Sequence, residues 1–215
     1  MSQPYKIEKQ LQAIPDALRT LLEGVETATI GHFEYLGFVG AGIAPVFPVK
    51  AIGTAVTVAA PGRDGAVIYT AIDLLRPGDV LVISRVDRDD VACVGGGVVA
   101  AARARGAVAI IVDGPCTDIE EIRASRFPVW CRGVSSKTTS RRHQIGGAIN
   151  VPIACGGAAV LPGYAVLADT EGVFVADPSD MRCIADVALE RQQRSLKLRP
   201  YLEAGHSIFE LDGMV

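Results

Sequence analysis

The sequence lacks the features that mark a secreted or membrane protein. Its five cysteines lie far apart, form no C-x-x-C pair and are odd in number, which argues against a disulfide framework or structural zinc site. The opening stretch MSQPYKIEKQLQAIPDALRTLL carries charges and proline where a signal peptide needs an unbroken apolar segment. No apolar run approaches the roughly 18 residues of a membrane-spanning helix. We therefore expect a cytoplasmic protein.

Basic residues are not in excess either. The 21 Lys and Arg residues and 24 Asp and Glu residues are spread along the chain, so no basic face is available to bind nucleic acid directly. The chain also lacks the G-x-G-x-x-G spacing of dinucleotide sites and the Gly-Lys-Ser/Thr of a P-loop. Because 49% of the residues are hydrophobic and no linker or repeat divides them, we expect one domain spanning residues 1–215.

Local patterns predict an α/β fold. Apolar residues at helical spacing predict an N-terminal helix over about residues 7–22, bent near Pro15. The region 37–48 is rich in glycine and proline and is expected to be a loop. Runs rich in β-branched residues predict three strands, at 53–59, 80–84 and 108–112. A helix over 97–105 joins the last two strands, which predicts a βαβ crossover with parallel strands.

The second half leans towards short strands separated by glycine turns. A helix over 118–125 is expected first, because an aspartate and two glutamates form its start. Strands are then predicted at 129–131, 151–154, 165–168 and 173–176. A C-terminal helix over about 178–198 and a short mixed tail, together residues 178–215, complete the chain.

A glycine cluster separates one predicted strand from the helix that follows. Gly95, Gly96 and Gly97 precede Val98, and unhindered N–H groups at such a helix start can hold a carboxylate or phosphate. A tight turn that needs positive φ explains the same glycines without a ligand. The cluster alone leaves both interpretations open.

Two aspartates flank the next turn in the string DGPCTDIEE. Asp113 ends an apolar strand and Asp118 opens the predicted helix. Ligands of open α/β sheets gather at the carboxyl ends of the strands, which is where Asp118 is expected. Such an aspartate is either a plain N-cap or, together with waters, a ligand of a hard cation such as Mg²⁺.

The spacing of these residues resembles the RraA-like family, which includes 4-hydroxy-4-methyl-2-oxoglutarate aldolases. Gly96, twenty intervening residues, Thr117-Asp118, two more residues and Glu121 follow that family's G-x20-R-D-x2-E/D pattern. The segments RARGAVAIIVDG, FPVWCRGVSS, NVPIACGGAAVLPG and ADTEGVFVAD are similar to successive segments of the family in the same order. The similarity covers about residues 53–176, more than half of the chain.

The resemblance implies a single-domain αββα-type sandwich of the RraA-like, swivelling-domain-like fold. It also implies homotrimers or hexamers with active sites between subunits. Asp118 would hold Mg²⁺ or Mn²⁺ largely through waters, and the N–H groups of Gly96, Gly97 and Val98 would bind the carboxylate of a 2-oxo acid. A divalent cation stabilises the enolate that arises from retro-aldol cleavage or from decarboxylation of oxaloacetate.

One position departs from the family pattern. The family's arginine is Thr117 here, so a neutral hydroxyl replaces a cation that binds carboxylates with two hydrogen bonds. Another cation of the segment CRGVSSKTTSRR can take over this role, and the candidates are Arg132, Lys137, Arg141 and Arg142. Clustered cations also occur in ordinary solvated loops. Alternatively, the site is catalytically weak and the protein acts through its surface.

Other candidates rest on single residues. His143 is a candidate base, but the sequence marks no partner for it. Cys116 has no identifiable histidine partner, and a small buried turn residue is the simpler interpretation. Glu121 either orients waters or complements the helix dipole. His32 and Tyr164 stand where the resemblance leads us to expect aspartates, which indicates a divergent subgroup.

Two functions therefore compete. The first is a metal-dependent carbon–carbon lyase of the aldolase or oxaloacetate-decarboxylase type. In it Asp118 is the metal ligand, Thr117 and Glu121 complete the catalytic site, and the glycine N–H groups, Arg132 and Lys137 bind the substrate. The second is a non-catalytic regulator that binds and inhibits a ribonuclease or another partner. We prefer the lyase because Asp118, Glu121 and the glycine loop are all retained.

Overall fold

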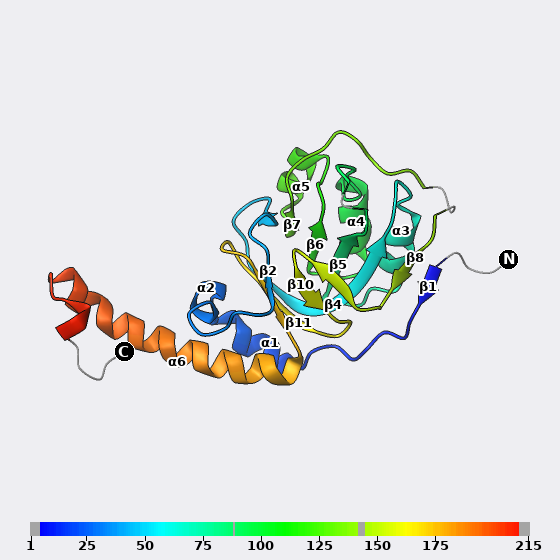
Figure 1. Cartoon of the computed structure of the whole chain (residues 1–215). Coiled ribbons are helices and arrows are strands. Elements are labelled where there is room, and N and C mark those ends of the chain that lie inside the picture. The colour runs from blue at the N-terminus through cyan, green and yellow to red at the C-terminus, as the bar shows by residue number, and fades with distance from the viewer. Residues whose placement is uncertain (1–4, 88, 142–144, 211–215) are drawn as a thin grey trace.

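A curled mixed β-sheet forms the centre of the computed structural model, which describes residues 5–87, 89–141 and 145–210 (Figure 1). The strands run in the order β2-β12-β11-β4-β5-β6-β7-β3, and β8 joins both β4 and β1. Their bounds are β1 (Tyr5–Ile7), β2 (Phe38–Val39), β3 (Ala44–Pro45), β4 (Ala51–Ala60), β5 (Asp79–Arg85), β6 (Ala109–Asp113), β7 (Val129–Cys131), β8 (Gly147–Ile149), β11 (Ala165–Ala168) and β12 (Val173–Ala176). A separate antiparallel hairpin is formed by β9 (Ile153–Cys155) and β10 (Ala158–Val160).

The parallel strands β4, β5, β6 and β7 form the part of the sheet that carries the candidate site. Strand β5 has alternating side chains: Leu81 and Ile83 enter one core, and Val80 and Val82 enter another. Both faces are therefore buried, which explains the continuous apolar run in the sequence. The predicted crossover is confirmed, because α4 (Gly96–Ala104) joins β5 to the parallel strand β6.

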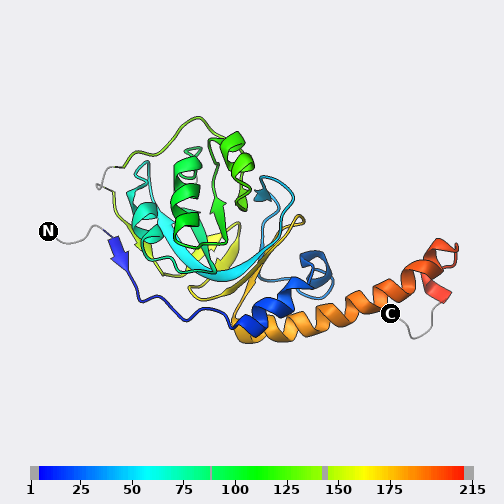
Figure 2. The same ribbon diagram turned by 180° about the vertical axis from the view of Figure 1, so that it is seen from behind.

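Helices lie on two sides of the strands. α3 (Ala66–Ile72), α4 and α5 (Ile119–Ser125) cover one face of the parallel strands (Figure 2). α1 (Asp16–Glu23), α2 (Thr27–Ile30) and α6 (Pro178–Glu203) pack against the β11–β12 side. A second core lies between the two halves of the curled sheet and contains Trp130. The layers confirm the predicted αββα-type sandwich.

Helix α6 leaves the body of the molecule after its first half. Its start is capped by Asp177, whose carboxylate accepts a 2.9 Å hydrogen bond from the Ser179 N–H group. Only residues in its first half are fully buried, and the second half projects away from the sandwich (Figures 1 and 2). Leu196, with 60% of its surface exposed, and Leu202 lie on this projecting part. A short 3-10 helix (Ile208–Glu210) follows.

The predicted N-terminal helix over residues 7–22 is wrong in its first half. Strand β1 ends at Ile7, and α1 begins only at Asp16, after Pro15. The chain between them is held by long-range hydrogen bonds, from Gln10 to the buried Asp79 carboxylate at 2.8 Å and from the Ile14 N–H group to Thr54 at 2.9 Å. These partners are far away in the sequence and replace the intrahelical bonds that periodicity predicts.

The remaining elements follow the predicted pattern with small shifts. The strands at 129–131, 165–168 and 173–176 are confirmed, and α6 extends beyond the predicted 198 to Glu203. The expected loop 37–48 contains the two short edge strands β2 and β3. In the described part of the chain, no helix has both the length and the apolar character needed to cross a membrane.

Candidate functional site

The candidate site lies at the carboxyl edge of the parallel strands, where the turns after β5 and β6 meet. Cys116 forms isolated bridges with both Val94 and Val134, so three rim segments run side by side. The Thr117 N–H group donates to the Val94 carbonyl oxygen at 2.9 Å, which fixes the residues just before α5 against those just before α4. Because of these bonds, the glycine cluster and the second aspartate of DGPCTD come together as predicted.

Asp118 has an unusual backbone conformation and does not cap its own helix. It occupies the N-cap position of α5 with φ 53° and ψ 40°, in the left-handed region, and its side chain makes no capping hydrogen bond. Its Oδ2 atom instead accepts a 3.0 Å hydrogen bond from the Gly96 N–H group, and Thr117 Oγ1 donates to Oδ1 at 3.4 Å. The left-handed conformation costs an L-residue about 1 kcal/mol or more. The structure thus contradicts the plain N-cap interpretation of Asp118.

Two carboxylates contact the glycine turn from the α5 side. A Cβ atom on Gly95 would lie 2.5 Å from Asp118 Oδ2, and one on Gly96 would overlap the Glu121 carboxylate. Glycine is therefore required at these positions for close approach of the two acids, which the positive-φ interpretation does not explain. Both acids are exposed, and a groove of about 230 Å³ runs from Gly96 past Glu121 between α4 and α5.

The first turn of α4 provides free N–H donors beside these acids. Val99 is the first residue with an intrahelical bond, its N–H group donating to the Gly95 carbonyl oxygen at 3.0 Å. The Gly96 N–H group is used by Asp118, so those of Gly97 and Val98 are left for a ligand. The positive end of the α4 dipole stabilises the existing Asp118 carboxylate, and it would stabilise an added anion in the same way.

The two predicted substrate-binding cations lie on the same rim but pair with other acids. Arg132 forms an ion pair with Asp113, whose second oxygen accepts a 2.7 Å hydrogen bond from the Gly156 N–H group. Lys137 pairs with Asp90 at 2.6 Å, and this hydrogen bond lowers the pKa of the Asp90 carboxyl. Neither ion pair includes Asp118 or the glycine turn, and the substrate-binding role of the two cations stays a prediction.

On the α3 side the turn meets a tyrosine that the sequence analysis missed. The Tyr69 hydroxyl oxygen lies 3.6 Å from the position of a Cβ atom on Gly97. The guanidinium carbon of Arg141, one of the predicted cations, lies 5.9 Å from the centre of the Tyr69 ring. Tyr69 stands in the run AVIYTAI, where no spacing or motif distinguishes it from a core residue.

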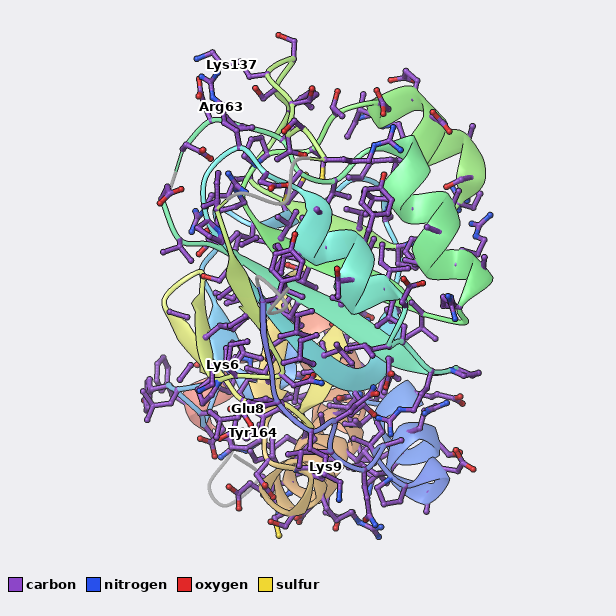
Figure 3. All side chains as sticks on the ribbon, turned by 90° about the vertical axis from the view of Figure 1, so that its right-hand side faces the viewer. Lys6, Glu8, Lys9, Arg63, Lys137 and Tyr164 are labelled. Atoms are coloured by element: carbon purple, nitrogen blue, oxygen red, sulfur yellow. The ribbon has the colours of Figure 1, made fainter. Side chains whose placement is uncertain are left out.

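The other single-residue candidates lie elsewhere or are buried. Cys116 is fully buried, and its hydrogen bond to Cys131 together with burial raises the pKa of its thiol, so it is a neutral core residue. His32 lines a cavity with residues of α6. Tyr164 lies at the opposite end of the face shown in Figure 3 from Arg63 and Lys137. His143 and Arg142 fall outside the described residues.

The acids at the turn fit a hard divalent cation better than a softer one. Among residues 5–87, 89–141 and 145–210, no group of three or more His, Cys, Asp or Glu side chains converges on a point. Asp118 and Glu121 both bring a carboxylate close to the glycine turn. Mg²⁺ commonly uses one or two carboxylates and keeps several waters, whereas a structural zinc site needs about four protein ligands. The donor set therefore suits Mg²⁺ or the similar Mn²⁺.

Comparison with protein families shows to which family this chain belongs. The model of the RraA-like family, described as Aldolase/RraA, matches residues 22–175. The chain belongs to the RraA-like family. This match covers the glycine turn, both acids, and all strands from β2 to β11, and it confirms the resemblance on which the sequence analysis relied.

RraA-like relatives of this chain carry two kinds of name. A protein of Halalkalibacterium halodurans called "Putative 4-hydroxy-4-methyl-2-oxoglutarate aldolase" is 33% identical over 143 residues, 66% of this chain and 67% of that protein. A similarly named protein of Cupriavidus necator is 30% identical over 63% of this chain and 83% of its own length. Streptomyces coelicolor RraAS2, described as an unusual member of the RNase ES inhibitor RraA family, is 26% identical with a TM-score of 0.76, covering 89% of this chain and 98% of that one.

A further solved structure supports the RraA-like fold alone. An uncharacterized protein from Pseudomonas syringae has a TM-score of 0.80 at 22% identity, with 94% of this chain and 96% of that chain covered. At family level the names therefore indicate both aldolases and ribonuclease inhibitors.

Proposed function

We propose that this RraA-like protein is a divalent-metal-dependent carbon–carbon lyase that acts on a small 2-oxo or hydroxy-oxo acid. The observation that carries the proposal is the carboxylate of Asp118. It is held in a strained backbone conformation, caps no helix of its own, and lies against the glycine turn beside the Glu121 carboxylate. A purely structural aspartate has no need of this arrangement, because an N-cap with ordinary φ stabilises a helix better.

The proposed reaction is retro-aldol cleavage or the related decarboxylation. Retro-aldol cleavage removes the proton of a 4-hydroxyl group, breaks the bond between C3 and C4, and leaves a pyruvate enolate that takes up a proton at C3. Bound Mg²⁺ or Mn²⁺ would supply positive charge next to the 2-oxo oxygen, where negative charge develops. Loss of CO₂ from a 2-oxo acid with a carboxylate at C3 gives the same enolate, so one site serves both reactions.

Residues of this chain have separate roles in the proposal. Asp118 holds the cation, and Glu121 orients the waters around it from one turn further along α5. The N–H groups of Gly97 and Val98 hold the C1 carboxylate at the N-terminus of α4. Thr117 does not replace the family arginine, because its hydroxyl group is directed to Asp118. It restricts the Asp118 side chain instead.

The proposal includes an oligomeric assembly of this chain. The projecting half of α6 carries exposed Leu196 and Leu202, and the 3-10 helix beyond it carries Phe209 with 93% of its surface exposed. Exposed apolar groups of this size on a helix that leaves its own domain favour burial against another subunit. We therefore propose that the chain forms a homotrimer or hexamer in which α6 packs on a neighbouring copy.

Pyruvate release tests the lyase. With Mg²⁺ or Mn²⁺ present, the protein is expected to release pyruvate from oxaloacetate or a 4-hydroxy-2-oxo acid, detected by coupling to lactate dehydrogenase. Asp118→Asn keeps an oxygen acceptor and tolerates the left-handed backbone, so it should retain the fold and lose the activity. If the folded, metal-supplemented protein released no pyruvate from any acid of such a panel, the lyase proposal would be wrong.

A second function is favoured by the match to RraAS2, which extends over nearly the whole of that chain. In this alternative the protein binds and inhibits a ribonuclease through protein contacts, and the turn at Asp118 is a retained but idle site. Addition of the purified protein to an RNase ES cleavage assay distinguishes the two functions. Inhibition that persists in Asp118→Asn would support the regulatory function. Unchanged RNA cleavage in the presence of excess protein would show that the regulatory function is wrong.

A further inference from the structure

Two cysteine thiols meet beside the turn that carries Asp118. Cys116 lies in this turn, between β6 and α5, and Cys131 is the last residue of β7. Their side chains share a hydrogen bond, and both belong to the core on the α3, α4 and α5 side of the sheet. Cys155 lies in the other core, and Cys183 is exposed on α6. The fold therefore brings together two thiols from different segments of the chain.

Hydrogen bonds fix the backbone around these two thiols. The Cys116 N–H group donates to the Gly133 carbonyl oxygen at 2.9 Å, and the Cys116 carbonyl oxygen accepts a 2.9 Å bond from the Ser135 N–H group. The Cys131 thiol donates to the same Gly133 oxygen at 3.3 Å. Because both cysteines are bonded to one carbonyl group, their contact is set by the backbone and not by flexible side chains.

The two thiols are not equivalent. The hydrogen bond that Cys131 accepts from Cys116 lowers the pKa of the Cys131 thiol, and the thiolate is the nucleophilic form of cysteine. Cys131 keeps 5% of its surface exposed, whereas Cys116 is fully buried. Pro115 and Arg132, the chain neighbours of the two cysteines, line a surface cavity of about 540 Å³. A small oxidant such as hydrogen peroxide can therefore come close to the pair, with Cys131 as the more reactive member.

We propose that Cys116 and Cys131 form a reversible disulfide when peroxide is present, and that this disulfide shifts the turn that carries Asp118. The Cys131 thiolate attacks one peroxide oxygen, which forms an S–O bond, breaks the O–O bond and releases hydroxide. The Cys116 sulfur then attacks the Cys131 sulfur, which forms the S–S bond and breaks the S–O bond. The two hydroxide ions take up the two thiol protons, so two thiols and one peroxide give one disulfide and two waters. Exchange with an external dithiol restores both thiols.

The disulfide is expected to displace the turn and not the sheet. An S–S bond is about 2.05 Å long, shorter than a contact between two unbonded sulfur atoms, so one of the two segments has to move. Strand β7 is held by β6 on one side and by β3 on the other. Cys116 lies two residues before Asp118, so movement of the turn disturbs the 3.0 Å bond between the Gly96 N–H group and the Asp118 carboxylate. The effect on metal binding rests on the proposed lyase function, whereas the disulfide itself does not.

Peptide mapping tests the disulfide, because each of the five cysteines lies in a different tryptic peptide. Full-length protein is treated with hydrogen peroxide, free thiols are blocked with iodoacetamide, and the digest is analysed by mass spectrometry without reduction. Peptides 106–123 and 127–132 are expected as one linked species that dithiothreitol separates. Cys155→Ala, which removes a buried thiol of the other core, is the control and should give the same linked species. Linkage of Cys116 to Cys93, or no linkage at all, would overturn the proposal.

Metal affinity and amide exchange test the effect on the Asp118 turn. The oxidised protein is expected to bind Mn²⁺ roughly tenfold or more weakly than the reduced protein, as when a metal ligand loses an outer hydrogen-bond partner. The Gly96 amide hydrogen should also exchange faster in the oxidised form, a readout that needs no metal. In Cys116→Ala, peroxide should change neither property, and dimedone should trap Cys131 as the sulfenic acid.

Two outcomes separate this inference from the proposed function. Equal Mn²⁺ affinity and equal Gly96 exchange in the reduced and oxidised wild-type protein would show that the disulfide does not move the turn, and would overturn the inference. Reduced protein that binds no Mn²⁺, together with faster Gly96 exchange after oxidation, would refute the metal site and leave the inference standing.

Discussion

The carboxylate of Asp118 accepts a 3.0 Å hydrogen bond from the N–H group of Gly96, a residue that lies 22 positions earlier in the chain. The bond joins the starts of two helices that follow neighbouring parallel strands, β5 and β6. It places a negative charge at the N-terminus of α4, where the helix dipole favours it. It also aligns the aspartate with Glu121, whose carboxylate contacts the same glycine turn.

Asp118→Gly is expected to separate stability from metal binding. Glycine adopts the left-handed φ of 53° freely, so the relief of strain offsets the lost hydrogen bond, and the free energy of unfolding should stay within about 1 kcal/mol of the wild type. Asp118→Ala loses the same bond and keeps the strain, and should be less stable than the glycine variant by roughly 1 kcal/mol. Urea titrations followed by Trp130 fluorescence give both values.

Both Asp118 variants should lose high-affinity Mn²⁺ binding, measured by the paramagnetic resonance signal of free Mn²⁺. Wild-type affinity for Mn²⁺ in a folded Asp118→Gly variant would show that the ion uses ligands other than Asp118.

Gly53→Ala is expected to destabilise the sheet. A Cβ atom there would overlap the carbonyl oxygen of Gly78 and lie 2.8 and 2.9 Å from methyl groups of Val80 and Val108. Overpacking in a closed core of this kind costs typically 1–3 kcal/mol. Gly172→Ala is the matched control, because no atom lies within 4 Å of its Cβ position and its φ is not positive. Equal midpoints of urea unfolding for the two variants would contradict the packing shown for β4.

Stability is expected to decrease at alkaline pH because of two buried thiols. Burial raises the pKa of Cys93 and of Cys155 from 9.0 to about 12. The unfolded chain therefore ionises these thiols first, so their contribution is complete below pH 9 and is lost as the pH rises towards 12. The slope is at most about 1.4 kcal/mol per pH unit for each thiol.

Cys155→Ala should remove the share of one thiol from this slope, as measured by urea titrations on either side of pH 9. Cys183→Ala, in which an exposed thiol is removed, should leave the slope as it is in the wild type. A slope that is the same in all three proteins would contradict the role of buried thiols.

The proposed assembly can be tested at the projecting half of α6. The double variant Leu196→Glu, Leu202→Glu places charge on exposed apolar positions and should lower the particle mass to that of a monomer in light scattering. Lys197→Glu changes the net charge by the same two units on the same helix and should keep the wild-type mass. A wild-type mass in the double variant would argue against subunit contacts through this half of α6.

Local sequence patterns predicted the interior strands. These strands are buried on both faces, so their residues form continuous apolar runs that can be recognised in the sequence. The predicted bounds of β5 and β6 lie within one or two residues of the observed bounds, since a β-branched run such as VLVIS favours a strand. The helix α3 was missed, because its run AVIYTAI is rich in β-branched and aromatic residues, which have low helix propensity. Its helical conformation depends on packing against the sheet. Strand β1 was missed because its partner, at Gly147 to Ile149, is far away in the chain.

The candidate site shows the same division. The acids and glycines could be named from the spacing that resembles a known family, and the structure brings them together. The left-handed conformation of Asp118 could not be predicted, because aspartate also caps helices with ordinary φ. Tyr69 and the orientation of Arg141 depend on how α3 packs beside α4, which no local pattern encodes.

The left-handed backbone at Asp118 also limits how this position can evolve. Glycine adopts such a φ without strain, asparagine and aspartate adopt it at a cost of about 1 kcal/mol, and β-branched and bulky side chains adopt it least readily. A gene copy released from selection for catalysis would keep its fold most easily by exchanging this aspartate for asparagine or glycine. Under the proposed function, the identity of this one residue across paralogues therefore separates lineages that retain the metal site from lineages that have kept only the scaffold.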